Sequence, residues 1–284
     1  MRWVRGTCLH LPYGRRADRD GSLLLHPFIP PLLHFCVTLA VVIPAFNEAR
    51  AIGLVVGDLP RAVDGWPVGE VVVVNNASTD ETEANARAAG ATVVREGRRG
   101  YGNACLAGLD HLRHRSEGPP GIVVFVDGDY SDHPDELPLL VGPILRGEAD
   151  FVLGSRMAGR TMGRHEPGAL LPQALVGNRL ACALLRAVWG VRCTDLGPFR
   201  ALRWEALDAL GMTDRTFGWT IEMQIRAAEA GLRFREVPVS YRRRVGVSKI
   251  TGTVSGTVRA SGKILWTILR YALTRRSRTY RLTK

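Results

Sequence analysis

The sequence lacks the cysteine spacing of a disulfide framework or a zinc site. Its five cysteines are widely separated and form no Cys-x-x-Cys pair, which argues against both kinds of site and favours a reducing compartment. The chain also lacks a clear N-terminal secretory signal. Its N-terminal apolar stretch, residues 22–37, is broken by three prolines and falls short of the roughly 20 residues that span a bilayer.

Lysine is scarce, since 35 of the 38 basic residues are arginine, and the basic charge is unevenly distributed. Residues 233–284 hold 14 Lys or Arg residues against the single acid Glu236, whereas the rest of the chain has a net charge of −2. The formal charge of +11 therefore belongs to the C-terminal segment. The sequence has no basic face interleaved with aromatic residues and no helix-turn-helix or RNP-like signature, so we expect no nucleic-acid partner.

With 284 residues, 46% of them apolar and 23% charged, the chain is long enough for one large domain with its own core. We interpret residues 1–37 as a poorly ordered extension, residues 38–250 as the globular domain, and residues 251–284 as an amphipathic helix with a basic tail. A start codon assigned too far upstream and a segment that touches a membrane are alternatives for residues 1–37.

From residue 38 onward, short apolar runs alternate with segments of helical spacing. We predict strands at 39–44, 70–74, 91–94, 122–126, 151–154 and 234–239, and helices at 48–59, 79–89, 102–114, 133–146, 172–188, 219–230 and 251–273. This alternation is typical of an α/β fold with a mostly parallel central sheet flanked by helices. Ligands of such sheets lie beyond the carboxyl ends of the strands, which here are the polar segments 44–48, 75–80 and 127–132.

The tripeptide Asp127-Gly128-Asp129 directly follows an apolar strand. Two carboxylates that flank a glycine at a strand end suit Mg²⁺ or Mn²⁺, which keep positions open for phosphate oxygens. The alternative is a turn whose acids only cap the next helix. The two other polar strand-end segments favour the metal site.

Eight ordered motifs carry a family resemblance. They are VVIPAFNEA (Val41–Ala49), VVVVNNASTDET (Val71–Thr82), GYGNACLAGL (Gly100–Leu109), VDGDYSDHPDEL (Val126–Leu137), GSR (Gly154–Arg156), TDLGPFRA (Thr194–Ala201), GWTIEM (Gly218–Met223) and EVPVSYRRRVGVSK (Glu236–Lys249). The set resembles family 2 glycosyltransferases of the GT-A fold. It is most similar to the polyprenyl-phosphate sugar synthases, the dolichyl-phosphate mannosyl- and glucosyltransferase-like branch.

The resemblance implies a nucleotide-sugar site. Its residues would be Pro44, Ala45, Phe46, Glu48, Asn75, Asn76, Asp127 and Gly128. Phe46 would lie beside the base and Glu48 would reach the ribose, although an acid in a first helical turn also suits the helix dipole. Asn75 and Asn76 stand where the family usually has Asp-Asp or Asp-Asn, and an amide oxygen also accepts a base N–H. The donor base, UDP or GDP, stays open.

The resemblance also implies the metal ligands. Asp129 would hold Mg²⁺ or Mn²⁺ against the diphosphate, and Asp127 would touch the ribose or the metal. Some relatives offer a further ligand two residues after the second Asp. Here that residue is Ser131, a weaker donor, with Asp132 next to it. Gly100 and Gly102 would let the backbone approach the donor, or would only make a turn.

Basic residues would serve the acceptor side. Arg156 matches an arginine that faces the acceptor phosphate, and Arg243 and Lys249 match a basic pair that closes over the diphosphate and acceptor. Arginine suits phosphate because its planar fork binds two oxygens at once. Arg179 is a loose candidate for a second acceptor-side arginine.

Asp195 and Glu222 are the candidates for a general base. A hydroxyl acceptor would need such a base, whereas a phosphate monoester is already anionic and needs none. The alternatives are that Asp195 positions the sugar or Arg156, and that Glu222 is a structural acid on a helix face.

The C-terminal helix is predicted to be amphipathic. Its apolar face would hold Ile264, Leu265, Ile268, Leu269 and Ala272, and its basic face Arg259, Lys263 and Arg270. A basic amphipathic helix with a basic tail favours binding to anionic lipid. The alternative is an ordinary helix that packs on the domain.

Together these features predict a metal-dependent, inverting glycosyltransferase. It would move a hexose from a UDP- or GDP-linked sugar to a polyprenyl phosphate, as a cytoplasmic protein bound peripherally at the inner face of the cell membrane. One alternative is a soluble glycosyltransferase that acts on a hydroxyl acceptor, such as a small acid or a glycan. A basic nucleic-acid-binding protein is a far weaker alternative.

Overall fold

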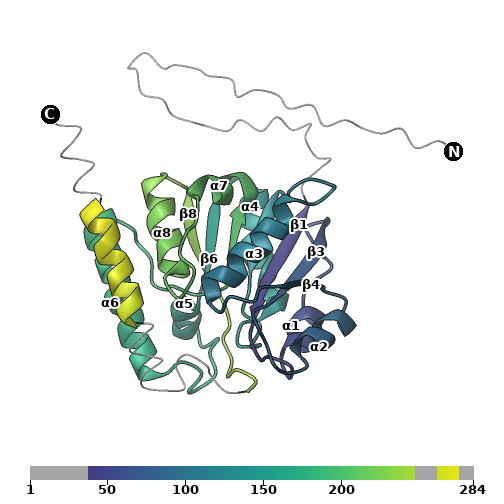
Figure 1. Ribbon diagram of the computed structural model, residues 1–284. Coiled ribbons are helices and arrows are strands. Elements are labelled where there is room, and N and C mark those ends of the chain that lie inside the picture. Colours follow the sequence, from purple (N-terminus) through teal and green to yellow (C-terminus); the bar gives the residue numbers. More distant parts are fainter. Residues whose placement is uncertain (1–37, 247–260, 275–284) are drawn as a thin grey trace, which may run out of the picture. The chain divides into compact units, whose positions relative to one another are not determined.

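The computed structural model describes residues 38–246 and 261–274, and its centre is one β-sheet (Figure 1). The strands are β1 (Leu39–Ala45), β2 (Ala62–Val63), β3 (Trp66–Asn75), β4 (Thr92–Arg95), β5 (Ile122–Phe125), β6 (Phe151–Ser155), β7 (Arg200–Arg203) and β8 (Phe234–Pro238). Their order across the sheet is β2-β3-β1-β5-β7-β6-β8, and β4 pairs with β3. The predicted α/β class is thereby confirmed.

Helices connect most of these strands. They are α1 (Ile52–Gly57), α2 (Thr82–Ala88), α3 (Tyr101–Arg113), α4 (Leu137–Leu145, after the 3₁₀ turn η1 at Pro134–Glu136), α5 (Arg156–Thr161), α6 (Pro172–Trp189), α7 (Trp204–Leu210) and α8 (Trp219–Glu229). Residues 261–274 are also helical, and we call them the C-terminal helix. Helices α3, α6 and α8 begin and end within one residue of their predicted bounds. Residues 251–260 of the predicted last helix lie outside the described residues.

The sheet is mixed because of two strands that the sequence pattern did not indicate, β7 and the two-residue β2, which pairs antiparallel with β3. Strands β1, β3, β4 and β5 pair in parallel, as predicted, and so do β6 and β8. Strand β7 runs antiparallel between β5 and β6. Its sequence, Arg-Ala-Leu-Arg, does not resemble a buried strand, yet Arg200 is buried and donates to the backbone carbonyls of Gly197 and Thr220. These bonds satisfy the buried guanidinium group.

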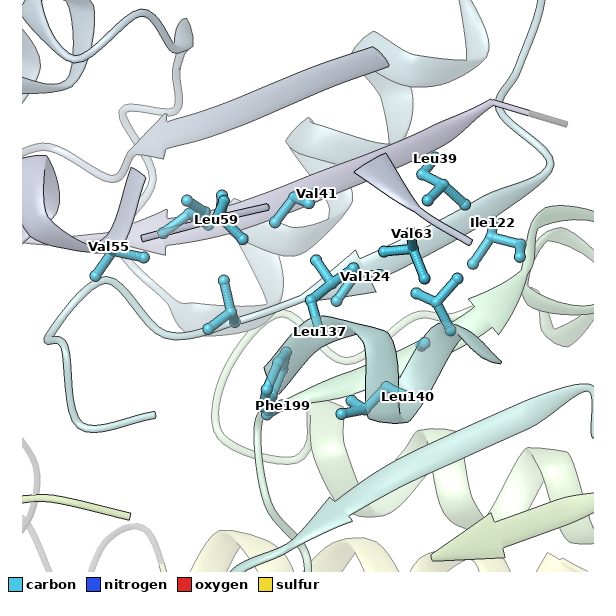
Figure 2. Close-up of a cluster of buried hydrophobic side chains, with 14 of the residues drawn as sticks. Leu39, Val41, Val55, Leu59, Val63, Ile122, Val124, Leu137, Leu140 and Phe199 are labelled. Carbon is cyan, nitrogen blue, oxygen red and sulfur yellow. The ribbon is translucent and has the colours of Figure 1, made fainter. Parts of the chain in front are cut away.

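Apolar side chains cover both faces of the sheet. Leu39, Val41 and Ile43 of β1 belong to the cluster under α1 and α4, which Figure 2 shows. Ala40 and Val42 point the other way, into the cluster under α3, α7 and α8. Since alternate strand residues face opposite sides, a strand buried on both faces needs an unbroken apolar run, which explains the sequence of β1.

A third, smaller cluster joins the C-terminal helix to the domain. Ile268 packs with Ala181 and Leu185 of α6 and with Ile221 and Ile225 of α8. Figure 1 shows the C-terminal helix, in yellow, beside α6. Among residues 38–246 and 261–274, no helix has both the length and the apolar composition to cross a bilayer.

Candidate active site

The three polar strand-end segments meet at one edge of the sheet, as predicted. Each contains a non-glycine residue with positive φ: Asn47 at 52°, Ala77 at 58° and Tyr130 at 62°. Such conformations are costly and cluster at functional sites. The first two segments are joined by hydrogen bonds from the Asn47 backbone N–H to Ser78 Oγ, 3.0 Å, and from the Thr79 backbone N–H to Asn47 Oδ1, 2.8 Å.

The third segment packs closely against the end of β1. A side chain added at Gly128 would lie 3.2 Å from the Pro44 carbonyl oxygen and 3.4 Å from Ala45 Cβ. Gly128 therefore brings the backbone between the two aspartates close to Pro44 and Ala45, the position predicted for the nucleotide pocket.

The site is centred on three carboxylates, Asp127, Asp129 and Asp132. Asp129 Oδ1 accepts hydrogen bonds from the Ser131 backbone N–H at 2.9 Å and from the Ser131 hydroxyl at 2.5 Å. Oδ1 of Asp127 and both carboxylate oxygens of Asp132 are buried without a hydrogen-bond partner. We call these three residues the acidic cluster.

Burial and mutual repulsion disfavour negative charge in the acidic cluster. Burial, together with the neighbouring Asp129 carboxylate, raises the pKa of Asp127 to about 7. Burial and the Asp127 carboxylate likewise raise the pKa of Asp132 well above its usual range. Buried carboxylate oxygens without donors are the ligands that a hard divalent cation prefers, so the acidic cluster fits Mg²⁺ or Mn²⁺.

The third predicted ligand, Ser131, directs its hydroxyl at Asp129, and its role as a ligand stays a prediction. Asp132 is buried, and the Asp127 carboxylate acts on it, so we count Asp132 with the acidic cluster. In the described part of the chain, no three His, Cys, Asp or Glu side chains are grouped so that they could hold a metal ion. A cation held by Asp127 and Asp129 would therefore keep positions open for phosphate oxygens.

An extended segment, residues 241–245, lies along the acidic cluster. The Arg242 backbone N–H donates to the Ser131 carbonyl, and the Val245 N–H donates to the Asp129 carbonyl, both at 3.0 Å. Arg244 reaches Asp129 Oδ2 at 3.3 Å through Nη1 and Glu48 Oε1 at 2.7 Å through Nη2. Arg244 thereby joins two predicted donor-site residues that lie far apart in the sequence.

Arg243, the arginine named from the motif, points elsewhere. Its guanidinium group donates to the Pro167 carbonyl oxygen at 2.8 and 3.0 Å, and its backbone N–H donates to Glu166. Neighbouring residues of an extended segment face opposite sides, so Arg244 faces the acidic cluster and Arg243 does not. The alternation of neighbouring residues can be read from the sequence. The sequence does not say, however, whether Arg243 or Arg244 is the one that faces the acidic cluster. Lys249 lies outside the described residues.

The predicted base-binding residues are partly occupied by contacts within the protein. The Asn76 amide group donates to the carbonyl oxygens of Glu96 and Arg98, and its Oδ1 accepts from the Gly100 N–H at 2.8 Å. Asn76 thus stabilises the loop before α3 through hydrogen bonds to its backbone. Asn75 Oδ1 accepts from the Ser78 N–H. The Arg99 guanidinium carbon lies 3.5 Å from the Phe46 ring centroid.

Gly100 and Gly102 serve a close backbone contact. Gly100 has φ 149°, and a side chain there would lie 2.2 Å from the Arg215 carbonyl oxygen. A side chain at Gly102 would lie 2.0 Å from the Asp214 carbonyl oxygen. Both glycines therefore let the first turn of α3 pack on residues 214–215, which agrees with the turn alternative rather than with approach to a donor.

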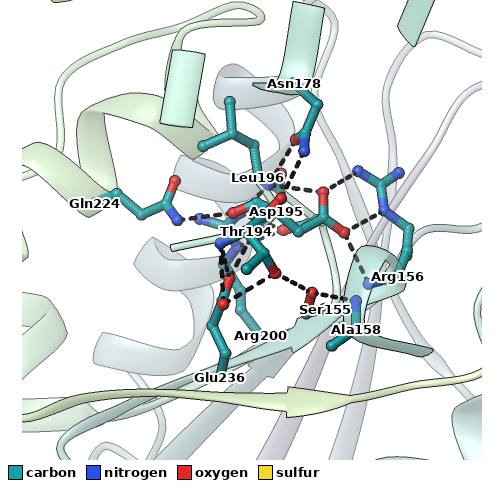
Figure 3. A network of polar contacts seen from close by, with 11 residues as sticks. Ser155, Arg156, Ala158, Asn178, Thr194, Asp195, Leu196, Arg200, Gln224 and Glu236 are labelled. Atoms are coloured by element: carbon teal, nitrogen blue, oxygen red, sulfur yellow. Dashed lines mark hydrogen bonds and ion pairs between the residues drawn. The ribbon is translucent and has the colours of Figure 1, made fainter. Parts of the chain in front are cut away.

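Arg156 and Asp195 form a buried ion pair (Figure 3). The Arg156 charge also lowers the pKa of Asp127 and Asp132 in the acidic cluster, against the larger effect of burial. Asp195 Oδ2 accepts from the Arg156 backbone N–H and Nε at 2.8 Å each, and Oδ1 accepts from Nη2 and from the Leu196 N–H at 2.7 Å each. The Asp195 side chain is 0% exposed. These four donors satisfy its carboxylate, so the geometry favours the alternative in which Asp195 positions Arg156.

Glu222 lies on α8 among structural partners. Its carboxylate accepts from the Thr213 and Asp214 backbone N–H groups, from Arg226 Nε at 3.0 Å and from the Tyr271 hydroxyl at 2.6 Å. Tyr271 belongs to the C-terminal helix, so Glu222 ties that helix to the domain. This position agrees with the structural alternative for Glu222.

An α/β sheet with an acidic cluster at its strand ends, faced by a basic segment, is an arrangement suited to a metal-bound anionic ligand. Residues 40–211 match the family model "Glycosyl transferase family 2", so the chain belongs to glycosyltransferase family 2 and is a glycosyltransferase. The predicted family is thereby confirmed.

Two curated relatives illustrate the similarity. An uncharacterized glycosyltransferase of Mycobacterium tuberculosis is 37% identical over 220 residues, which cover 77% of this chain and 92% of the relative. A dolichyl-phosphate hexose transferase of Haloferax volcanii is 36% identical over 220 residues, which cover 77% and 89%. The second relative confirms the resemblance to the polyprenyl-phosphate branch.

A solved structure supports the fold. Glucosyl-3-phosphoglycerate synthase from Mycobacterium tuberculosis, in complex with Mn²⁺, UDP and glucosyl-3-phosphoglycerate, superposes with a TM-score of 0.65 at 27% identity. The match covers 83% of this chain and 80% of that one. The predicted GT-A fold is thus confirmed.

Proposed function

We propose that the protein is a metal-dependent, inverting hexosyltransferase that moves a hexose from a UDP- or GDP-linked sugar to a polyprenyl phosphate. The acidic cluster, with buried oxygens that no donor satisfies, is the observation that supports a metal-bound diphosphate donor. The similarity to a dolichyl-phosphate hexose transferase supports the acceptor.

The acidic cluster would hold Mg²⁺ or Mn²⁺ through Asp127 and Asp129. When bound, such a cation offsets the charge that develops on the departing nucleoside diphosphate. Arg244 lies beside Asp129 and would bind a diphosphate oxygen through its guanidinium group. Glu48, which already pairs with Arg244, would reach the ribose, and Phe46 would lie beside the base.

Arg156 would bind the acceptor phosphate. Asp195 holds three of its N–H-bearing atoms, the backbone N, Nε and Nη2, which fixes the orientation of the guanidinium group. A phosphate oxygen of the acceptor then attacks C1 of the sugar. The new C–O bond forms as the bond to the diphosphate breaks on the opposite side, so the anomeric configuration inverts.

The hydrogen bonding of the two general-base candidates, Asp195 and Glu222, favours a phosphate acceptor over a hydroxyl acceptor. The carboxylates of Asp195 and Glu222 are both engaged by donors within the protein. A hydroxyl acceptor would need a free base, whereas a phosphate monoester is anionic near neutral pH. Transfer to a small hydroxy acid remains the second candidate, since the similar solved synthase is complexed with glucosyl-3-phosphoglycerate.

A transfer assay tests the proposal. The purified protein is incubated with UDP- or GDP-linked hexoses, Mn²⁺ or Mg²⁺, and either a short polyprenyl phosphate or 3-phosphoglycerate. We expect a sugar-linked lipid phosphate on chromatography, and no product after chelation of the metal. Product from 3-phosphoglycerate alone would instead support the hydroxyl-acceptor candidate.

We further propose peripheral contact with the inner face of the membrane through α6 and the C-terminal helix. Seven of the ten exposed large apolar residues among the described residues lie on these helices or on the residue before α6. They are Leu171, Val176, Leu180, Leu265, Trp266, Leu269 and Leu273. The predicted apolar face is divided, because Ile264 and Ile268 pack on the domain while Leu265 and Leu269 are exposed.

Serine substitutions at Trp266 and Leu269 are expected to weaken vesicle binding. These side chains are 58% and 50% exposed, so their loss should leave the fold unchanged and remove apolar area that would enter the lipid interface. Sedimentation with phosphatidylglycerol vesicles should show roughly tenfold less bound protein for the double variant. Leu54→Ser, at an exposed leucine on α1, is the matched control. Equal binding of all three proteins would contradict membrane contact through this helix.

A further inference from the structure

The chain reverses its direction at the end of α6. Gly190, the residue after the helix, has φ 72°, a left-handed conformation that glycine adopts readily. The following segment then returns along the helix. The Asn178 side chain of α6 donates through Nδ2 to the Thr194 carbonyl oxygen at 2.8 Å and accepts through Oδ1 from the Leu196 N–H at 2.9 Å, as Figure 3 shows. Residues 193–196 are thereby held against α6.

This return brings two cysteines together. Cys182 lies four residues after Asn178, on the same face of α6, and Cys193 directly precedes Thr194. Both cysteines line the cavity between α5 and α6, and Cys193 packs on the apolar cluster that contains Cys182. The neighbouring Cys193 thiol, together with burial, raises the pKa of Cys182 well above its usual range. The two thiols are therefore neighbours in space.

The two cysteines differ in their access to solvent. Both are free thiols, but Cys193 is partly exposed in the cavity wall, whereas Cys182 is only 7% exposed. Cys105, the other cysteine among the described residues, is 0% exposed and belongs to a different apolar cluster. An accessible cysteine beside a second thiol is the arrangement in which the first is oxidised and the second then forms a disulfide with it.

We propose that Cys182 and Cys193 are a modification site, a redox-active pair that a peroxide converts to a disulfide. The Cys193 sulfur attacks hydrogen peroxide, the O–O bond breaks, and Cys193 becomes a sulfenic acid with release of one water molecule. The Cys182 sulfur then attacks the Cys193 sulfur, and the S–S bond forms as the sulfenic hydroxyl leaves as a second water molecule. Two thiols are oxidised by two electrons in total, and both peroxide oxygens are reduced to water.

The disulfide links α6 covalently to the segment that carries Asp195. Asp195 is two residues after Cys193 and holds Arg156 through their buried ion pair. In the reducing compartment that the cysteine spacing favours, such a bond is transient rather than structural. Formation of the disulfide does not depend on the proposed function; only a consequence for transfer, through Arg156, would rest on it.

Peptide mapping of the full chain tests the proposal. The reduced protein is treated with hydrogen peroxide, the remaining thiols are blocked with N-ethylmaleimide, and the protein is digested with trypsin without a reductant. Cleavage after arginine places Cys182 in peptide 180–186 and Cys193 in peptide 193–200, with residues 187–192 released between them. We expect mass spectrometry to show these two peptides joined, and dithiothreitol to separate them. Cys105, in peptide 100–113, is the internal control and should stay a thiol.

Cysteine variants test the order of the two steps. In Cys182→Ser, the Cys193 sulfenic acid has no neighbouring thiol, so we expect dimedone to trap it on peptide 193–200. In Cys193→Ser, the buried Cys182 should be oxidised several-fold more slowly than Cys193 is in the wild-type protein. Dimedone trapping at Cys182 but not at Cys193 would overturn the assignment of Cys193 as the first site of attack.

An asparagine variant tests the geometry. Asn178→Ala removes both hydrogen bonds that hold residues 194–196 on α6, so the two sulfurs should meet less often. We expect half-oxidation to need a several-fold higher ratio of oxidised to reduced glutathione. Asn85→Ala is the matched control, because Asn85 also donates from a helix to a backbone carbonyl oxygen, that of Ala49 at 2.8 Å, but on α2. Equal ratios for Asn178→Ala and the wild-type protein would overturn the role of this segment.

The outcomes separate this proposal from the proposed function. Peptides 180–186 and 193–200 that stay unlinked after peroxide treatment would overturn the proposal, and so would a link from Cys193 to a different cysteine or to a second chain. All of these measurements are made without donor or acceptor. Absence of hexose transfer by a reduced protein that still forms the disulfide on oxidation therefore contradicts the proposed function alone.

Discussion

Asp129→Asn is expected to abolish hexose transfer while the protein stays folded. The substitution removes one negative charge where the cation and the diphosphate would meet, and loss of a single electrostatic contact of this kind costs about 10²–10³-fold in rate. The asparagine oxygen still accepts from Ser131, as Asp129 Oδ1 does now, so the loop should keep its conformation. Initial rates with a nucleotide-sugar donor, at several Mn²⁺ concentrations, measure the loss.

The matched control for this prediction is Asp135→Asn. Asp135 lies in η1, six residues after Asp129, but its side chain is 63% exposed and pairs only with His133 among the described residues. We expect unchanged rates for the control and an unchanged circular-dichroism melting curve for both variants. Metal-dependent transfer at the wild-type rate by Asp129→Asn would refute the assignment of the acidic cluster.

Asp195→Ala is expected to lower the free energy of unfolding by about 3–5 kcal/mol, the usual cost of leaving a buried charge without its partner. Asp195 is 0% exposed and Arg156 is 16% exposed, so water cannot replace the four hydrogen bonds that the carboxylate accepts. Urea denaturation measures the effect.

An exposed ion pair provides the comparison for Asp195→Ala. Asp208→Ala removes the ion pair with Arg113. The side chains of Asp208 and Arg113 are 47% and 46% exposed, so the substitution should lower the free energy of unfolding by at most about 1 kcal/mol. The double variant Asp195→Ala Arg156→Met should recover part of the lost stability, because it also removes the unpaired cation. Equal losses for the buried and the exposed pair would show that the Arg156–Asp195 pair has no structural role.

The structural partners of Asp195 and Glu222 affect how loss of activity in variants of these residues is interpreted. Alanine substitutions at Asp195 and Glu222 would remove the two candidates for the general base that only a hydroxyl acceptor needs. Both carboxylates hold structural partners, Arg156 in one case and Tyr271 of the C-terminal helix in the other. Loss of activity in either variant therefore needs a stability measurement before it indicates a general base.

Local sequence patterns determined much of the fold. The apolar runs of β1 and β5 and the helical spacing of α3, α6 and α8 are set by neighbouring residues, and the structure agrees with their predicted bounds. The strand-end rule also placed Asp127 and Asp129 correctly beside the end of β1. Strand β7 escaped this reasoning because Arg200, a charged residue, is buried there by bonds to distant carbonyl groups.

By itself, the sequence determined the α/β class, the family resemblance and the position of the Asp-Gly-Asp motif at a strand end, because each depends on residues close together in the chain. Only the tertiary structure decided that Arg244 rather than Arg243 faces the acidic cluster, since this follows from the register of segment 241–245. The pairing of Arg244 with Glu48, 196 residues away, also required the tertiary structure. Such contacts depend on how strands and helices pack, which local residue patterns do not encode.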